Sequence, residues 1–473
     1  MTVETLPPGM DASFRGQIIR PGDTDYNATR AVFNGMVDKR PSLIVRPSGS
    51  LDVADAVNYA RGHDLPVAVR CGGHSVAGKS TTEGGVLIDL RSLKGVHVDP
   101  VARIAYCNGG ALWGEFDRET QAFGLATPGG RMTTTGVGGF TLGGGYGWLS
   151  PVHGLACDNL VSVDVVTADG RVVIASEDIN PELFWGVRGG GGNFGVVTSY
   201  RFRLHPVGPI VRAGLLIWSA TEAESVIAGW RDYVEQAPDE LSTALGMLVA
   251  PPEPFVPTDL VGKPVLAMFV LYAGDPDDGM DCIEPLTKLG NVQVNLVEPM
   301  PYTTFQAMPD PMAPAGWLNY WRGHHLAGLD GGAIDAYAAL GRELPSAMTQ
   351  LIMFRHGGAV SRVADDAMAA SHRDAVYMMH PIAQWQDPVD TARHRAWVER
   401  CGAAIEPHLT GGTYINFEPD DDEAKVRAGY SADKYAKLVA IKDAWDPDNL
   451  FRENLNIKPS GADHERRHQR ATP

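Results

Sequence analysis

Residues 70–75, with the sequence RCGGHS, form a segment whose residue types could bind and hold a ligand. The apolar run 66–70 is typical of a β-strand, so the segment would begin where a strand ends. Two glycines allow the main chain to approach a ligand closely, and successive backbone N–H groups can bind an anion such as a pyrophosphate. The imidazole of His74 would then lie beside that ligand. The alternative interpretation is a tight turn that carries a surface histidine.

A second segment, residues 124–147, is the most glycine-dense part of the chain and includes TTTGVGG at 133–139 and LGGGYG at 142–147. Each glycine in a regular element costs roughly 0.5–1 kcal/mol relative to alanine, so this density indicates that something approaches the main chain. A flexible linker is the alternative, but such linkers are polar, whereas Val, Phe, Leu, Tyr and Trp are interleaved here.

A third segment, GGGGNFG at 189–195, contains a literal G-x-G-x-x-G match. A dinucleotide-binding fingerprint needs a strand before this motif and a helix after it. Here a helix opening at Asn180 is expected before the motif and a strand at 195–204 after it. The order therefore argues against an NAD site.

The elements that would position these segments follow from hydrophobic periodicity. Apolar residues recur at helical spacing on one face of residues 51–64, and Ser50 is the expected N-cap. A second helix is expected at 111–123. Strands are expected at 43–47, 66–70, 85–90, 102–107, 161–167, 171–175, 264–272, 349–355 and 375–384.

Further motifs accompany the three segments: GLACDNL at 154–160, LFWGVRGGGGNFG at 183–195, Tyr414-x-Asn416, and DPDNLF at 446–451. In this order the motifs resemble those of the FAD-linked oxidases of the vanillyl-alcohol oxidase and p-cresol methylhydroxylase (PCMH) superfamily. Within it, the chain is most similar to the berberine-bridge-enzyme-like branch. The motifs extend from about residue 40 to residue 457, and their joint order is specific although each alone is not.

The resemblance implies an α+β fold. A PCMH-type FAD-binding domain of two subdomains would span 38–208, and a substrate domain with a large antiparallel sheet flanked by helices would span 209–408. The segment 409–460 would return to the FAD domain, and 461–473 would be a disordered tail. The sequence HPVGP at 205–209 interrupts the strand pattern where the first boundary is expected.

The resemblance also implies that His74 bonds covalently to the 8α-methyl group of FAD. Many members of the branch have a second link, from a cysteine to flavin C6, but Met132 stands at that position and cannot form it. We therefore expect FAD attached through His74 alone, as in the members similar to 6-hydroxynicotine oxidase and to the mitomycin-resistance protein. Cys157 lies in a different motif and is interpreted as a buried thiol.

Tyr414 is the candidate catalytic base under the same resemblance, although a free tyrosine has a pKa of about 10 and would need a lowered pKa or a concerted transfer. The alternative is a core tyrosine with a satisfied hydroxyl. Thr135 falls where the family has a residue thought to influence access of O₂. Cofactor contacts are expected at Arg70, Cys71, Gly72, Gly73, Ser75, Gly78, Thr134, Thr135, Gly136, Gly138, Gly139, Gly143, Gly144, Asp158, Val197, Asn416 and Asn449.

The substrate wall is less well marked. Aromatic residues of the middle region would suit a ring-bearing or sugar ligand, and Tyr302, Trp321 and Tyr377 are the residues we select. His356, Arg373 and His380 are candidate polar contacts.

Composition restricts the partners. The 473 residues carry a net charge of −17, which disfavours binding to nucleic acid or to an anionic membrane. The first residues lack the basic and apolar regions of a signal peptide, so a cytoplasmic location is expected. Five cysteines without a CxxC pair give no indication of a metal site.

The expected function is that of an oxidase. It would move a hydride from a small alcohol, amine, sugar or secondary metabolite to covalently bound flavin, with O₂ as acceptor and H₂O₂ as product. Two alternatives stay open: a flavin-containing drug-binding or resistance protein, and a flavin dehydrogenase with another acceptor. Neither the substrate nor the oligomeric state follows from the sequence.

Overall fold

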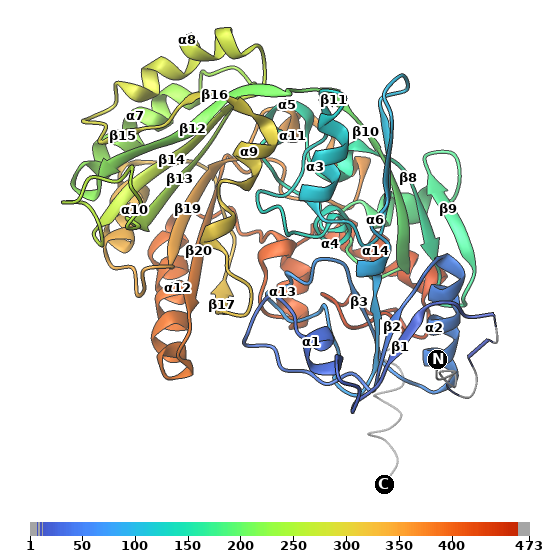
Figure 1. Cartoon of the computed structure of the whole chain (residues 1–473). Coiled ribbons are helices and arrows are strands. Elements are labelled where there is room, and N and C mark those ends of the chain that lie inside the picture. Colours follow the sequence, from blue (N-terminus) through green and yellow to red (C-terminus); the bar gives the residue numbers. More distant parts are fainter. Residues whose placement is uncertain (1–6, 8–9, 12, 462–473) are drawn as a thin grey trace.

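The computed structural model describes residues 7, 10–11 and 13–461 (Figure 1). Apart from Gly461, the expected tail lies outside these residues. Among the described helices, none combines the length and the apolar character that crossing a bilayer requires.

The first sheet has the strand order β1-β2-β4-β3, from β1 (Gln17–Ile19), β2 (Leu43–Arg46), β4 (Val86–Asp89) and β3 (Val67–Arg70). β2, β4 and β3 run parallel, and helix α2 (Ser50–Gly62) connects β2 to β3. The helix buries Val53, Ala56, Val57 and Ala60, on the face that periodicity predicts, but Gly49 rather than Ser50 is its N-cap. β1 lies before residue 38, so this subdomain begins earlier than the sequence indicated.

The second sheet is antiparallel, in the order β5 (Val96–Asp99), β6 (Ile104–Asn108), β10 (Val196–Arg203), β8 (Leu160–Val166) and β9 (Val172–Ser176). Helices α3 (Trp113–Gln121), α4 (Val137–Leu142) and α6 (Pro181–Val187) accompany it. The glycine-dense segment thus contains a short helix, α4, which the glycine content did not suggest. A Cβ atom on Gly138 in that helix would lie 2.9 Å from the Tyr200 hydroxyl, so close packing excludes a side chain.

The third sheet is large and antiparallel (Figure 1). Its strands are β12 (Ile210–Ser219), β13 (Leu241–Val249), β14 (Pro264–Tyr272), β15 (Val294–Asn295), β16 (Glu298–Pro301), β17 (Leu318–Trp321), β18 (His324–Leu326), β19 (Gln350–Arg355) and β20 (Tyr377–Trp385). One face packs against α7 (Ala223–Val234), α8 (Pro276–Thr287), α10 (Gly331–Arg342) and α12 (Thr391–Ile405). The other face packs into the same hydrophobic core as the second sheet. Because successive side chains along a strand point to opposite faces, Leu215 and Ile217 face that core, whereas Leu216 and Trp218 face the helices.

Shorter elements connect these layers. They are α1 (Tyr26–Arg30), β7 (Leu125–Ala126), α5 (Ser150–His153), β11 (His205–Pro206), α9 (Tyr302–Ala307) and α11 (Ala359–Arg362). β11 pairs with β7 where the chain passes from the second sheet to the large third sheet.

The C-terminal segment returns to the first half of the chain through α13 (Glu423–Ala428) and α14 (Ala432–Trp445), and α14 packs against α6 (Figure 1). Lys442 on α14 donates to the carbonyl oxygens of Asn193 at 2.8 Å and Phe451 at 3.0 Å. It also pairs at 2.6 Å with Asp446, and both side chains are fully buried. The Lys442 ammonium, paired with Asp446, therefore connects the C-terminal segment to the 189–195 loop through the Asn193 carbonyl.

Replacing Asp446 with alanine should lower the free energy of unfolding by about 3–5 kcal/mol, because the buried Lys442 ammonium loses its counter-ion. Urea denaturation followed by tryptophan fluorescence measures the change. Glu284→Ala is the control: its pair with Lys288 has side chains 57% and 67% exposed and should contribute less than about 1 kcal/mol. Equal losses in the two variants would contradict the structural role given to the buried pair.

Candidate active site

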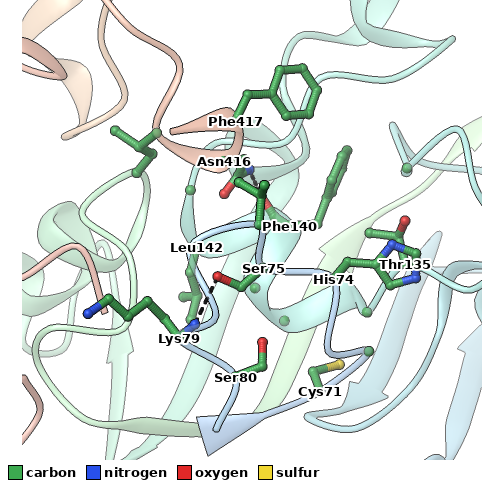
Figure 2. Close-up of a pocket in the computed structure, with 18 of the residues that line it drawn as sticks. Cys71, His74, Ser75, Lys79, Ser80, Thr135, Phe140, Leu142, Asn416 and Phe417 are labelled. Carbon is green, nitrogen blue, oxygen red and sulfur yellow. Dashed lines mark hydrogen bonds between the residues drawn. The ribbon is translucent and has the colours of Figure 1, made fainter. Parts of the chain in front are cut away.

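A cavity of about 410 Å³ lies between the glycine-rich loops and the large sheet, within the ordinary size range of ligand sites. Figure 2 shows the part of its wall that carries His74, Thr135 and Asn416. Its wall includes residues 71–77, 130–132 and 190–193. The C-terminal segment contributes 415–418, and the large sheet contributes Phe354 and other side chains from its inner face. The three glycine segments singled out in the sequence therefore meet at one site.

Two of these segments touch through their main chains. A Cβ atom on Gly136 would lie 2.2 Å from the Gly72 nitrogen, and one on Gly72 would lie 2.3 Å from the Gly136 nitrogen. Neither position has room for a side chain. By contrast, a Cβ atom on Gly139 or Gly192 would meet no atom within 4 Å, and both glycines line the cavity. They present open backbone to a ligand, which is the role that the glycine content predicted.

The 189–195 loop is held by contacts with the segments around Ala370, Tyr430 and Leu455. A Cβ atom on Gly189, whose φ is +119°, would lie 2.1 Å from the Ala370 nitrogen. The Tyr430 hydroxyl donates to the Gly189 carbonyl at 3.0 Å, and the Asn193 amide donates to the Leu455 carbonyl at 3.1 Å. The loop follows α6 and precedes β10, so the helix–loop–strand order predicted for it is confirmed.

His74 stands on the cavity wall (Figure 2). Its ring stacks on Phe33 with centroids 4.2 Å apart and an interplanar angle of 15°. Its Nε2 lies 3.1 Å from the Thr134 hydroxyl oxygen. Burial lowers the pKa of His74 to about 4, so the imidazole is neutral near pH 7 and one ring nitrogen keeps a lone pair for bonding.

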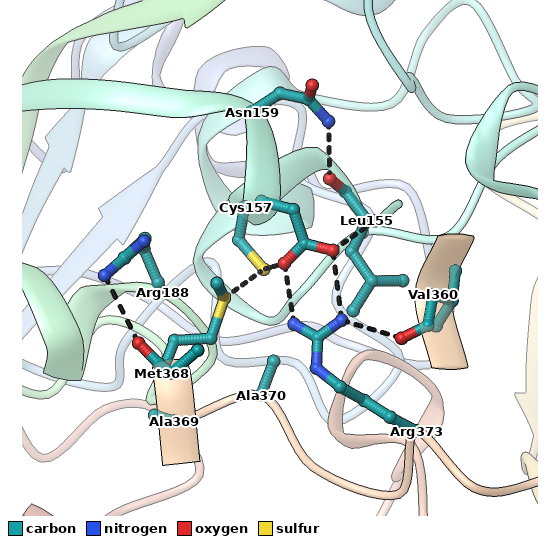
Figure 3. Close-up of polar contacts among 12 residues, drawn as sticks. Leu155, Cys157, Asn159, Arg188, Val360, Met368, Ala369, Ala370 and Arg373 are labelled. Carbon is teal, nitrogen blue, oxygen red and sulfur yellow. Dashed lines mark hydrogen bonds and ion pairs between the residues drawn. The ribbon is translucent and has the colours of Figure 1, made fainter. Parts of the chain in front are cut away.

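Three sulfur-containing side chains lie near the site: those of Met132, Cys71 and Cys157. Met132 lines the cavity. The Cys71 thiol donates to the Ala111 carbonyl at 3.3 Å, and burial raises its pKa to about 11. Cys157 is fully buried, with its sulfur 3.6 Å from that of Met368, and burial also raises its pKa (Figure 3). Cys157 is thus a buried thiol, as the sequence indicated.

Tyr414 does not project into the cavity. Its hydroxyl oxygen accepts from the backbone N–H groups of Gly145 at 3.0 Å and Tyr146 at 3.1 Å, and from the Asn416 amide at 3.0 Å. Burial raises the pKa of Tyr414, against the lowering effect of these donors. The structure therefore places the Tyr414 hydroxyl against the glycine block and off the cavity wall, while its three donors would stabilise a phenolate. The assignment of Tyr414 as the base stays a prediction.

Many expected cofactor contacts do line the cavity. They are Cys71, Gly72, Gly73, Ser75, Thr135, Gly136, Gly138, Gly139, Gly143, Val197 and Asn416. Gly143 is required by Asn416, because a Cβ atom there would lie 2.0 Å from the Asn416 Oδ1 atom.

Arg70 and Asp158 are structural instead. The Arg70 guanidinium pairs with Asp89 at 2.7 Å, beneath the loop that carries His74, and both side chains are buried. Asp158 pairs with Arg373 at 2.6 Å (Figure 3). Arg373 was a candidate polar contact for the substrate, and the structure shows it as an ion-pair partner. These residues connect segments of the fold and do not reach the cavity.

Four further expected contacts also lie off the cavity wall. Gly78, with φ +67°, packs on Val37. Thr134 is not on the wall, but its hydroxyl oxygen contacts His74, which is. Gly144 and Asn449 have positive φ values of +109° and +53° and shape turns.

The residues expected to contact the substrate do not all lie on the cavity side of the large sheet. Trp321 lines the cavity. Tyr377 is fully buried on the opposite, helix-covered face, where its hydroxyl donates to Glu235 at 3.2 Å. Tyr302 is buried in α9 and does not reach the cavity. Of the polar candidates, His380 lines the cavity and His356 lies behind it, against the Tyr146 ring.

The sequence did not identify several residues of the wall: Phe33, Arg131, Tyr146, Trp148, Gln350, Phe354, Gln384, Phe417 and Asn454. Arg131 adjoins the glycine pair 129–130, which was a usable signal. Phe33 precedes every motif, and nothing in its neighbourhood pointed to the stack on His74.

Comparison with known proteins agrees with this geometry. A family model described as an FAD binding domain matches residues 41–176, and one described as berberine and berberine-like matches 413–458. An FAD-linked oxidoreductase of Dictyostelium discoideum is 31% identical over 451 residues, covering 94% of this chain and 95% of that protein. The (R)-6-hydroxynicotine oxidase of Paenarthrobacter nicotinovorans is 30% identical over 473 residues, covering 95% and 98%.

The fold has solved counterparts. The 6-hydroxy-D-nicotine oxidase of Arthrobacter nicotinovorans superposes with a TM-score of 0.86 at 29% identity, covering 95% of this chain and 99% of that one. Near-complete coverage at this identity extends the likeness over both halves of the molecule. The chain belongs to the FAD-linked oxidoreductases of the berberine-bridge-enzyme-like family.

Proposed function

We propose that the protein is an oxidase that holds FAD covalently through His74 and transfers a hydride from a small substrate to it. The observation that carries the proposal is a neutral imidazole on the wall of a glycine-lined cavity. When bound, the flavin supplies a hydride acceptor whose electrons pass on to O₂. The protein residues must therefore hold the cofactor, orient the substrate and take up a proton.

The residues present fit FAD. The open backbone of Gly139 and Gly192 offers the close approach that a pyrophosphate needs, while Gly72 and Gly136 fix the loops on either side. A His74 ring nitrogen would bond the flavin at its 8α-methyl carbon, and Phe33 fixes the ring plane. Met132 stands where a second link would be made, so a single attachment is proposed.

For proton removal, the cavity wall offers His380 on β20. Its ring stacks on Phe417 with centroids 3.7 Å apart, and its Nε2 has no hydrogen-bond partner. Burial lowers the pKa of His380 well below the ordinary value, so the imidazole is neutral near pH 7. It would take up a proton where the bound substrate stabilises the imidazolium that forms. Tyr414 would instead position Asn416, to which its hydroxyl is bonded.

The two alternatives differ from an oxidase in turnover. A sequestering protein would bind its ligand stoichiometrically, and a dehydrogenase would be reduced by substrate but react slowly with O₂. The relatives named as 6-hydroxynicotine oxidases favour turnover with O₂, which peroxide release measures directly.

Replacing His74 with alanine should remove the covalent flavin without unfolding the protein. The denatured wild-type band should fluoresce yellow-green on a gel under ultraviolet light, and the His74→Ala band should be dark. His97→Ala, an exposed histidine on β5, is the matched control and should fluoresce fully. A fluorescent His74→Ala band would place the attachment elsewhere.

Gly139→Ala and Gly136→Ala should distinguish a glycine that leaves room for the cofactor from a glycine that the fold requires. The Gly139 methyl group would enter the open cavity, so the variant should fold normally but contain less flavin per chain. The Gly136 methyl group would collide with the Gly72 backbone, so this variant should lose stability as well. Flavin absorbance and thermal melting measure both, with Gly62→Ala, which meets no atom within 4 Å, as control. Full flavin loading of Gly139→Ala would argue against FAD at this position.

His380→Asn should lower kcat by about 10²–10⁴-fold, the usual contribution of a general base, while leaving the flavin content unchanged. Tyr414→Phe should keep kcat within about tenfold of the wild type, because its oxygen only accepts hydrogen bonds from the protein. Anaerobic flavin bleaching by substrate measures the chemical step in both variants. The reverse order of effects would favour Tyr414 as the base.

A further inference from the structure

Arg131 is a charged residue on the cavity wall that the proposed function leaves without a task. The lysine and the two carboxylates on the wall are neutralised by ion pairs within the protein. Lys79 pairs with Asp421, Glu418 with Arg322, and Glu453 with Lys39. Within the described part of the chain, Arg131 forms no ion pair, and its Nε and Nη2 atoms have no hydrogen-bond partner.

Aromatic rings surround the guanidinium. Its central carbon lies 3.8 Å from the centroid of Phe354, 4.5 Å from that of Trp148 and 4.9 Å from that of Tyr146. Stacking of this kind uses the faces of the guanidinium. A side-chain hydrogen bond to Tyr146 uses part of its in-plane edge, and the Nε and Nη2 donors are left for another group. Burial lowers the pKa of Arg131 to about 10, so it is still a cation near neutral pH.

The carboxylates of neighbouring segments are committed elsewhere. Asp310 accepts from the Thr133 backbone at 2.8 Å and from its hydroxyl at 2.5 Å. Asp117 accepts from Gln306 at 2.8 Å, and burial raises its pKa to about 7. The Tyr146 hydroxyl donates to the Arg355 carbonyl. An unpaired buried donor on a charged group is destabilising, and a bound anion would supply the missing acceptor.

We infer that the substrate is an apolar carboxylate whose carboxylate group binds Arg131. The planar guanidinium fork matches a carboxylate in two parallel hydrogen bonds. Trp148 and Phe354 flank the guanidinium, and Phe269 packs on Trp148. All three line the cavity and would contact the apolar body of the substrate. This inference rests on the proposed function and gives its substrate a chemical class.

Calorimetric titration of the holoprotein with benzoate and phenylacetate tests the inference, with benzamide and phenylacetamide as neutral counterparts of the same shape. The wild type should bind the acids about tenfold or more tightly than the amides. Arg131→Met should weaken acid binding by about 10–100-fold and leave amide binding unchanged, with Arg131→Lys intermediate. Arg171→Met, an exposed arginine paired with Asp169, should behave as the wild type.

Equal binding of acids and amides by the wild type would overturn the inference, and this comparison needs no variant. Failure of the wild type to bind either acid at millimolar concentration would overturn it as well. So would a shifted flavin potential in Arg131→Met with acid binding retained, because Arg131 would then face the cofactor. Acid-selective binding by a protein without flavin would uphold the anion site and refute the oxidase.

Discussion

The close contact between the main chains of Gly72 and Gly136 is the constraint on which the site depends. It joins the loop after β3 of the first sheet to the start of α4 beside the second sheet. A side chain at either position would force the two loops apart, and His74 and Gly139 would separate with them. The two subdomains therefore form one binding surface because both residues lack a Cβ atom.

Buried ion pairs hold the other parts of that surface. Arg70 and Asp89 lie under the His74 loop, Asp158 and Arg373 connect the second subdomain to the segment after β19, and Lys442 and Asp446 fix the C-terminal segment. Removing one member of such a pair leaves an uncompensated charge in the interior. Against this pattern of internal pairing, the unpaired Arg131 on the cavity wall stands out as a group reserved for a ligand.

The sequence predicted what depends on local patterns. The apolar face of α2, the strands on either side of it and the glycine loops all follow from periodicity and backbone requirements. What it could not supply was the direction of individual side chains. Tyr377 and His380 lie on the same strand, yet an odd separation of three residues sends Tyr377 to the helices and His380 to the cavity. The choice between them needs the orientation of the strand, which the chain alone did not give.

Tyr414 illustrates the same limit. Its motif was recognisable, but the direction of its hydroxyl is set by two backbone N–H groups from a turn about 270 residues away in the chain. Arg70 and Asp158 were likewise in motifs and turned out to be ion-pair partners of distant residues. Motif membership thus located the site, whereas contacts between distant segments decided which members face the ligand.

A crystal structure of the purified yellow protein tests the central claim most directly. We expect continuous density from the His74 ring to an isoalloxazine, with the pyrophosphate against the backbone of Gly139 and Gly192 and the substrate-binding space ending at Arg131. Density for the cofactor at another place, or a cavity closed by neighbouring side chains with His74 unmodified, would contradict it.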